Sequence, residues 1–227
     1  PATVHLAGSL DLRDRVAGRF QLAVDDIPLD GQLYHALPPA AQNWWLKLDP
    51  KGQMSARSDV NVTVSPAGES GFSHCTTLLL ADNQACWDSF PLPLNHLNGK
   101  VVLTAGRCEV QELTATHESG QIRADGAIDW DGAGTRAVFR ISARDMPLNE
   151  PLRLAVPWQI RRIWNSWLPT GQIDLDFPRL RYTRPRDAGA TWGLTGSLSG
   201  RLQKMDMGID VRDAVIKTSV TAHIDEQ

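Results

Sequence analysis

Hydrophobic and polar residues alternate with a period of two along much of this 227-residue chain. The pattern runs over nine positions at residues 122–130, and it recurs at residues 20–24, 60–64, 173–177 and 205–211. Successive side chains of a β-strand point to opposite faces of a sheet, so the alternation predicts strands with one apolar and one polar face. Turn-forming residues separate these strands, at 66–68, 98–99, 105–106, 119–120, 131–134 and 187–189. The short connections indicate an antiparallel meander, because parallel strands need longer crossovers.

A helical spacing of apolar residues interrupts this alternation once in each half of the chain. Between Pro38 and Pro50, the residues at i, i+3, i+4 and i+7 are Ala41, Trp44, Trp45 and Leu48. Between Pro157 and Pro169, they are Ile160, Ile163, Trp164 and Trp167. A proline is tolerated in the first turn of a helix, and a proline or glycine ends one. We therefore predict one short amphipathic helix in each half, packed on or capping the sheet.

The two halves are copies of one unit. Shifting the chain by 119 residues aligns eleven identical residues between positions 20 and 54, where about two are expected at average residue frequencies. Phe20 falls on Phe139, and Trp45 falls on Trp164. We predict two tandem repeats, residues 1–118 and residues 119–227, that share one continuous sheet. Because the chain starts at Pro1, we also expect it to be a piece of a longer protein in which the second repeat continues.

These elements predict an all-β protein with one short helix per repeat. A dozen or more strands would share an apolar face that two short helices cannot cover, and such a face is not stable in water. The sheet would then form a sandwich, a barrel, or an open trough that meets a non-protein ligand. The tandem repeat favours the trough, an elongated, curved antiparallel sheet, because stacked units extend in one dimension. The residues expected to line or support its concave side are Leu10, Leu22, Val24, Val62, Val64, Leu103, Ile122, Ile128, Ile141, Ile173, Leu175 and Ile209.

Charge and cysteine content narrow the possible functions. The formal net charge is -3, whereas a general nucleic-acid binder needs Lys and Arg in excess, so we expect no nucleic-acid partner. Cys75, Cys86 and Cys108 have no CxxC spacing, which argues against a zinc site. Cys75 and Cys86 would face each other if a hairpin turned near residues 81–83, but three buried free thiols are the favoured state. Both redox states stay open at this point.

Motifs of catalysis are absent from the sequence. The six histidines are scattered without an HExxH pattern, and no GxSxG, P-loop or GxGxxG follows a predicted strand. Asp174 and Asp176 fall on the polar side of an alternating strand, so they indicate a solvated face rather than an acid–base pair. Asp26 recurs as Asp145, which indicates an Asx-type turn or a helix cap. We therefore expect no enzymatic activity, no metal and no cofactor.

Aromatic and basic residues each suggest a binding role with a simpler alternative. Exposed tryptophans would suit sugar stacking, but Trp44, Trp45, Trp164 and Trp167 fit packing between helix and sheet better. A stretch of arginines would suit anionic lipid headgroups, although a solvated face is the favoured interpretation and the first repeat lacks most of it. This stretch comprises Arg153, Arg161, Arg162, Arg179, Arg181, Arg184 and Arg186.

A family resemblance emerges from these short motifs. The segment Phe90 to Gly99, followed by apolar residues at 101–103 and 108–113 and then by Gly120 to Trp130, resembles the recurring strand-and-turn pattern of AsmA-like proteins. The Asp-x-Pro-Leu turns at Asp26 and Asp145 are similar to those of long members of that group, which look like relatives of chorein-type, repeating β-groove lipid-transfer proteins. The resemblance implies a taco-shaped sheet with an apolar trough, in a periplasmic or cell-envelope bridge that carries phospholipid between membranes. It also implies an inner-membrane anchor, which would lie outside these residues.

The sequence thus predicts a non-enzymatic segment of a lipid-transfer or envelope-maintenance protein. Its expected partners are phospholipid or another lipid, and the adjacent repeats of the parent chain. Burial of about 0.8 kcal/mol per methylene would hold acyl chains in the trough. The alternative is a structural or adhesive β-repeat module, closed as a sandwich, that binds a protein or a glycan through its loops.

Overall fold

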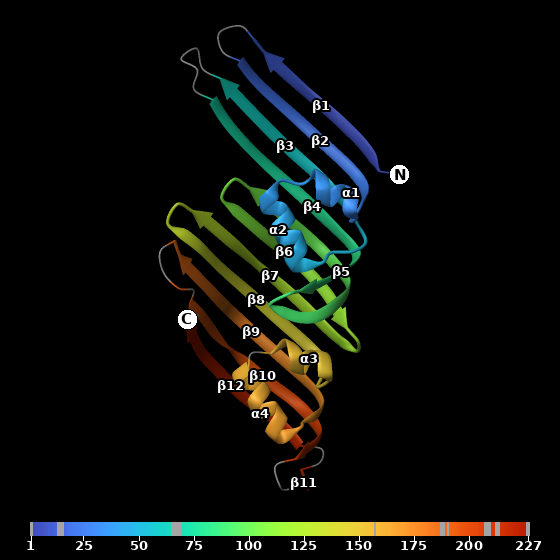
Figure 1. The fold of residues 1–227 in the computed structure, drawn as a ribbon, viewed down its shortest axis with the longest axis vertical. Coiled ribbons are helices and arrows are strands. Elements are labelled where there is room, and N and C mark those ends of the chain that lie inside the picture. Colours follow the sequence, from blue (N-terminus) through green and yellow to red (C-terminus); the bar gives the residue numbers. More distant parts are fainter. Residues whose placement is uncertain are drawn as a thin grey trace.

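The computed structural model describes residues 2–12, 16–64, 70–156, 158–186, 189, 191–206, 210–211 and 214–225. They form one antiparallel sheet in which β1 to β11 are neighbours in chain order and β12 pairs with β10 (Figure 1). The strands are β1 Thr3–Asp11, β2 Val16–Pro28, β3 Gln53–Val64, β4 Ser70–Trp87, β5 Phe90–Thr104, β6 Arg107–His117, β7 Gly120–Asp131, β8 Gly134–Pro147, β9 Thr170–Pro185, β10 Thr191–Asp206, β11 Asp210–Val211 and β12 Ala214–Asp225. The helices are α1 Gly31–Ala36, α2 Pro39–Leu48, α3 Glu150–Ala155 and α4 Trp158–Trp167.

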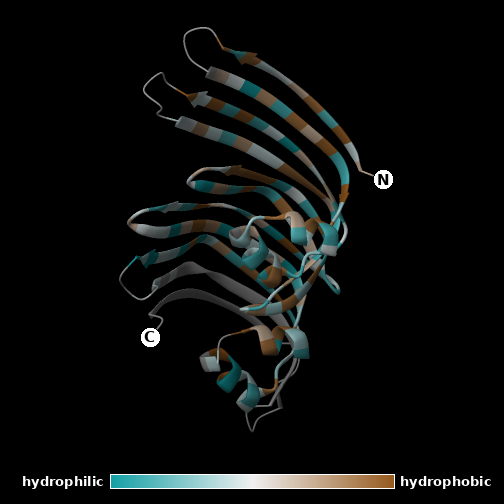
Figure 2. Ribbon diagram, turned by 45° about the horizontal axis from the view of Figure 1, so that its top comes forward, coloured by the Kyte–Doolittle hydropathy of each residue, from teal (hydrophilic) through white to brown (hydrophobic). Residues whose placement is uncertain are grey.

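The sheet is open and curved, which confirms the predicted fold class. In Figure 2 the strands arch along their length, and both helix pairs lie on the inner side of the arch. The described strands belong to a continuous path of pairing that crosses from the first repeat into the second without a break. No second sheet packs on this one within the ranges given above, so the sandwich expected for an adhesive module is wrong.

The 119-residue repeat is visible in the backbone geometry. The register between β2 and β3 shifts between Val24 and Ile27, and the register between β8 and β9 shifts at the equivalent place, between Ala143 and Met146. Within these bulges Asp26 and Asp145 adopt positive φ angles of 55° and 51°. The predicted Asx-type turn or helix cap at these aspartates is therefore wrong. They are bulge residues inside strands, and a short polar side chain tolerates the left-handed backbone that a bulge requires.

Each repeat carries two helices rather than the single one predicted. The ten-residue helices α2 and α4 cover the predicted segments, and a six-residue helix precedes each of them. The Asp30 side chain caps α1 by accepting from the backbone N–H groups of Gln32 and Leu33 at 2.9 and 3.1 Å. Asn149 caps α3 in the same way, through the N–H of Leu152. A helix of six residues is too short to show an apolar period, so only these capping residues mark it in the sequence.

Strand number explains why the two helix pairs are equivalent in space. Six strands, β3 to β8, separate the pair that follows β2 from the pair that follows β8. An even number of antiparallel strands returns the chain to the same end of the sheet. Both helix pairs therefore lie at the same strand ends, and Figure 1 shows them on the same face.

The most buried apolar residues lie where the second helix pair meets the sheet. Leu92 of β5, Ala143 and Met146 of β8, and Leu152 and Ala155 of α3 form one cluster. Partly buried side chains surround it, including Trp164 of α4. The cluster fixes α3 on the inner side of the arch, since burial of apolar surface is the main favourable term in packing.

Strands β4 and β5 are longer than their sequence patterns suggested. The hairpin near residues 81–83 that would have brought Cys75 and Cys86 together is absent, because β4 runs without a turn from Ser70 to Trp87. Cys75 and Cys86 lie on this one strand, about 36 Å apart at 3.3 Å per residue, so they cannot form a disulfide with each other. All three cysteines are free, and Cys75 is exposed rather than buried, whereas Cys86 and Cys108 are half-buried.

Residues 98–99 also form no turn. They lie inside β5, where the register with β6 shifts and Gly99 has a φ of 150°. Turns do occur at residues 105–106, 118–119 and 132–133, as predicted to within a residue. The turn signals at residues 66–68 and 187–188 lie outside the described residues, and so do residues 207–209 of the predicted strand at 205–211.

Candidate functional site

The registers decide which side chains share a face of the sheet, because residues paired directly across antiparallel strands point the same way. Leu10 and Val62 both pair with Gly18, while Leu22 pairs with Leu6 of the edge strand. Following the pairings from β1 to β9 places eleven of the twelve residues of the predicted lining on one face. They are Leu10, Leu22, Val24, Val62, Val64, Leu103, Ile122, Ile128, Ile141, Ile173 and Leu175. Ile209 lies outside the described residues.

This apolar face is not covered evenly. Near the first strand it is open, because Leu10 and Leu22 are exposed, and so are Val4 and Leu6 beside them. Near α3 it is covered, because Ile122, Ile173 and Leu175 pack against the buried cluster. These three residues therefore support the helix pair instead of lining the open part of the face. The other eight of the eleven predicted lining residues lie either in the open part of the face or between the open part and the covered part.

The opposite face is polar and carries charge pairs that run across neighbouring strands. Arg57 donates to Asp25 at 2.8 Å, and Arg107 donates to Asp129 at 2.7 Å. The hydrogen bond with Asp129 is the main reason that the pKa of Arg107 is raised. Opposite charges that lie directly across neighbouring strands attract each other, and such pairs support the pairing of the strands. This face is thus suited to contact with water, so the sheet has one polar face and one apolar face.

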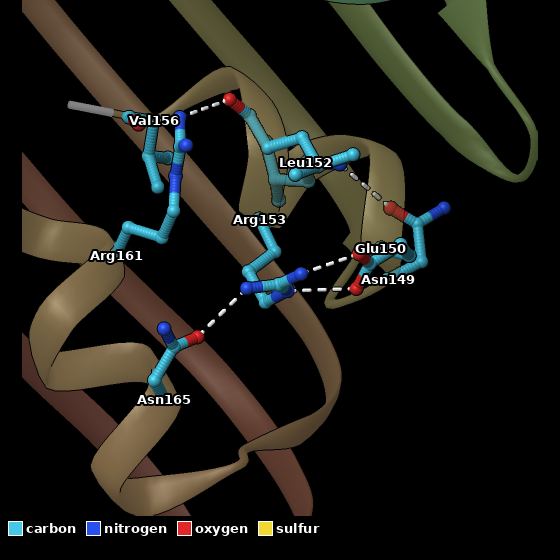
Figure 3. Close-up of polar contacts among 8 residues, drawn as sticks. Asn149, Glu150, Leu152, Arg153, Val156, Arg161 and Asn165 are labelled. Carbon is cyan, nitrogen blue, oxygen red and sulfur yellow. Dashed lines mark hydrogen bonds and ion pairs between the residues drawn. The ribbon is translucent and has the colours of Figure 1, made fainter. Parts of the chain in front are cut away.

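Hydrogen bonds join the two helices of the second pair (Figure 3). The Arg161 guanidinium donates to the backbone carbonyls of Leu154 and Val156, which lie at the end of α3. Arg153 of α3 joins Glu150 to Asn165 of α4, and its Nη1 lies 2.8 Å from the Asn165 side-chain oxygen. The hydrogen bond from Arg153 is the main cause that lowers the pKa of Glu150.

The first repeat uses the same arrangement with a different residue. Gln42 lies 119 positions before Arg161, and its amide donates to the carbonyls of Tyr34 and Leu37 at 3.1 and 3.0 Å. In both repeats a side chain of the longer helix donates to carbonyls at the end of the preceding short helix, and the Tyr34 carbonyl accepts from the backbone N–H of Leu37 as well. This contact between the two helices is therefore a property of the repeat unit.

These contacts divide the predicted arginine-rich stretch. Arg153 and Arg161 make the hydrogen bonds that join α3 to α4. The other five arginines are exposed: Arg162, Arg179, Arg181, Arg184 and Arg186. Arg162 lies on α4, and Arg181 pairs with Val138 on the polar face of the sheet. The stretch does not form a single headgroup site on one face, which leaves the solvated surface as its interpretation.

The four helix tryptophans also divide. Trp45 and Trp164 are half-buried, and Trp164 packs against the cluster under α3. Trp44 and Trp167 are exposed, so the predicted packing between helix and sheet is wrong for these two. A helix that touches the sheet along a narrow line buries only the residues that face that line.

The one described buried histidine has a structural role. His117 Nδ1 lies 2.9 Å from the carbonyl oxygen of Pro93, and Nε2 lies 3.2 Å from the Asn149 side-chain nitrogen. A carbonyl only accepts, so Nδ1 donates and Nε2 accepts, which is a neutral imidazole. His117 therefore links β5 and β6 to the residue that caps α3. Among the described side chains, no group of three or more His, Cys, Asp or Glu could hold a metal ion.

Within the described part of the chain, no helix is long and apolar enough to cross a lipid bilayer. The chain matches no family model, no curated protein and no solved structure. The resemblance to AsmA-like proteins therefore remains a prediction, and the apolar face has to be interpreted from its own geometry.

Proposed function

We propose that this chain is a non-enzymatic segment of a lipid-transfer or envelope-maintenance protein, and that its concave apolar face holds the acyl chains of phospholipids. The observation that supports this most is the single apolar face that continues from β1 to β9, with the polar face behind it. Two pairs of short helices lie on that face, and its open part includes large exposed residues such as Val4, Leu6 and Leu10. An apolar surface of this extent marks a binding surface.

The shape of the face favours lipid over a second protein layer. Two concave faces placed together meet at their rims and enclose a void, whereas packed protein layers interdigitate with few voids. A helix is about 10 Å across, and stacked sheets lie about 10 Å apart. The helix pairs therefore occupy the layer that a second sheet would need at these strand ends. Acyl chains are flexible and fill an irregular space without a matched surface.

The energetics of such a face suit passive movement. Each methylene moved from water gains about 0.8 kcal/mol. The acyl chains of a phospholipid that comes from a membrane are already out of water, so the free energy of its transfer onto the apolar face is close to zero. Headgroups would stay at the rim of the arch in water. We propose a periplasmic or cell-envelope location, a membrane anchor elsewhere in the parent protein and adjacent repeats as partners, and these parts of the proposal rest on the family resemblance alone.

Lipid extraction of the purified chain tests the proposal, with substitutions matched between the two faces. Leu22→Glu with Leu103→Glu puts two carboxylates on the apolar face. Ala23→Glu with Thr104→Glu puts them on the polar face, directly opposite Arg57 and Arg107.

Mass spectrometry of organic extracts should find phospholipid with the unmodified chain and with the polar-face variant. The apolar-face variant should carry little or none, because a buried carboxylate is costly beside an acyl chain. Absence of lipid from the unmodified chain, or equal lipid in both variants, would overturn the proposal. Far-ultraviolet circular dichroism shows whether each variant keeps its strands.

A further inference from the structure

A cleft of about 660 Å³ lies at the junction between the two repeats. One wall belongs to the first repeat and consists of the turn between β4 and β5 with the start of β5, residues 88–91. The other wall belongs to the second repeat and consists of the end of α3, residues 154–156, with Arg161 of α4. Figure 1 shows the end of the β4–β5 hairpin between the two helix pairs. Clefts of this size bind small molecules.

Arg161 brings a positive charge to this cleft and has N–H donors that its contacts do not use. Its Nη2 donates to the carbonyls of Leu154 and Val156, but its Nε–H is buried without a hydrogen-bond partner. Glu150 does not neutralise the charge, because its carboxylate already binds Arg153. A buried donor without a partner is unfavourable, and an anionic oxygen is a strong acceptor for a guanidinium. The site therefore favours an anion.

Contact between the two helices does not require this charge. Gln42, the equivalent of Arg161 in the first repeat, donates to carbonyls at the end of α1. A neutral amide is therefore sufficient to join the short helix to the longer helix that follows it. The arginine of the second repeat adds a positive charge at the cleft, and the helix contact does not explain that charge.

Asp88 brings the opposite charge from the facing wall. Its backbone N–H donates to the carbonyl of Lys47 at 2.8 Å, which ties the turn to α2. Its exposed carboxylate accepts from Ser89 Oγ at 2.9 Å. Neither Asp88 nor Arg161 forms an ion pair within the described part of the chain. One cleft thus presents a cation and an anion that do not pair with each other.

We infer that this cleft binds the headgroup of a phospholipid with a primary ammonium group, so that Arg161 holds the phosphate and Asp88 holds the ammonium. The inference rests on the proposed function and adds where the headgroup is held. A guanidinium binds phosphate through parallel N–H···O bonds. Phe90 and Leu154 are exposed beside the charges and suit the apolar part of the lipid. Ala155 lines the cleft and also belongs to the buried cluster, so the cleft adjoins the apolar face.

The carboxylate selects among headgroups. A phosphoglycerol headgroup has no cation for Asp88, and a phosphocholine headgroup has a quaternary ammonium without an N–H donor. Phosphoethanolamine supplies both the charge and the donors. The preference should be about two- to fivefold, which is the effect of one exposed ion pair.

Soluble headgroups test the cleft apart from the acyl-chain surface. Phosphorus-31 NMR titrations measure Kd for glycerophosphoethanolamine, glycerophosphoglycerol and glycerophosphocholine. The unmodified chain should bind the first most tightly. Asp88→Asn should remove that preference. Arg161→Gln should weaken all three by about tenfold, because each carries the phosphate that the guanidinium binds.

Matched controls separate the cleft from general surface charge. Glutamine keeps the helix contact, as Gln42 does, so Arg161→Gln should keep the fold. Arg162→Gln and Glu118→Gln remove exposed charges outside the cleft lining, and they should leave all three Kd values unchanged. The chain should also take phosphatidylethanolamine from vesicles in preference to phosphatidylglycerol with the same acyl chains, and Asp88→Asn should reduce this preference.

The outcomes separate the two ideas. If no soluble headgroup binds, or Arg162→Gln weakens binding as much as Arg161→Gln, the headgroup cleft is wrong while lipid extraction still decides the proposed function. If glycerophosphoethanolamine binds as expected but the unmodified chain carries no lipid, the cleft stands as a phosphoethanolamine site and the proposed function fails.

Discussion

Replacing Leu152 by alanine tests whether the buried cluster holds the second helix pair on the sheet. Leu152 is 4% exposed and packs within the cluster. A leucine-to-alanine change at such a site costs about 2–5 kcal/mol, because it removes apolar burial and leaves a cavity. Leu33 holds the equivalent position in α1 but is only half-buried. The same substitution there should cost about 1–2 kcal/mol, since less apolar area leaves water when the chain folds.

Thermal unfolding followed by tryptophan fluorescence measures the difference. In a chain of this size each kcal/mol changes Tm by about 2–4 °C, so Leu152→Ala should lower Tm by roughly 4–20 °C. Leu33→Ala should lower Tm by only roughly 2–8 °C. Urea titrations serve as a check, because an unchanged slope shows that the transition still exposes the same surface. Equal shifts for the two variants would refute the account of the cluster as the anchor of α3.

Two further predictions concern ionisable groups. Burial raises the pKa of the Cys108 thiol, whereas Cys75 is exposed. Because the thiolate is the reactive form, a thiol reagent should label Cys75 before Cys108. The substitution Cys75→Ser should therefore remove the fast phase of labelling. Equal rates for the two thiols would contradict this. The hydrogen bond from Arg153 lowers the pKa of Glu150 in the folded chain. The stability that this ion pair contributes is therefore complete above the pKa of Glu150 in the unfolded chain, about 4.3. It is lost as the pH falls through the lower pKa of the folded chain. The Tm difference between the unmodified chain and Glu150→Gln should therefore shrink below about pH 4, and a difference that stays constant with pH would show that the ion pair does not stabilise α3.

The sequence alone was enough to predict the sheet and its two faces. A strand has a period of two, so residues such as Ile122 and Ile128 must share a face whichever strands lie beside them. The identity of Trp45 with Trp164 and of the residues around them was likewise enough to predict that the two halves carry equivalent helices. These features depend on neighbours within a few residues, and local patterns report such neighbours reliably.

Other features depend on residues that are distant in the chain. The bulges at Asp26 and Asp145 arise from the registers with β3 and β9, and β4 continues through residues 81–83 because it pairs with β5 despite the turn-forming residues there. The sequence predicted the apolar stripe of α4, but it placed that stripe against the sheet. Only the tertiary structure shows that Trp164 faces the cluster while Ile163 and Trp167 stay exposed. The physical reason is that periodicity determines which side chains share a face, whereas burial depends on which distant surface lies opposite.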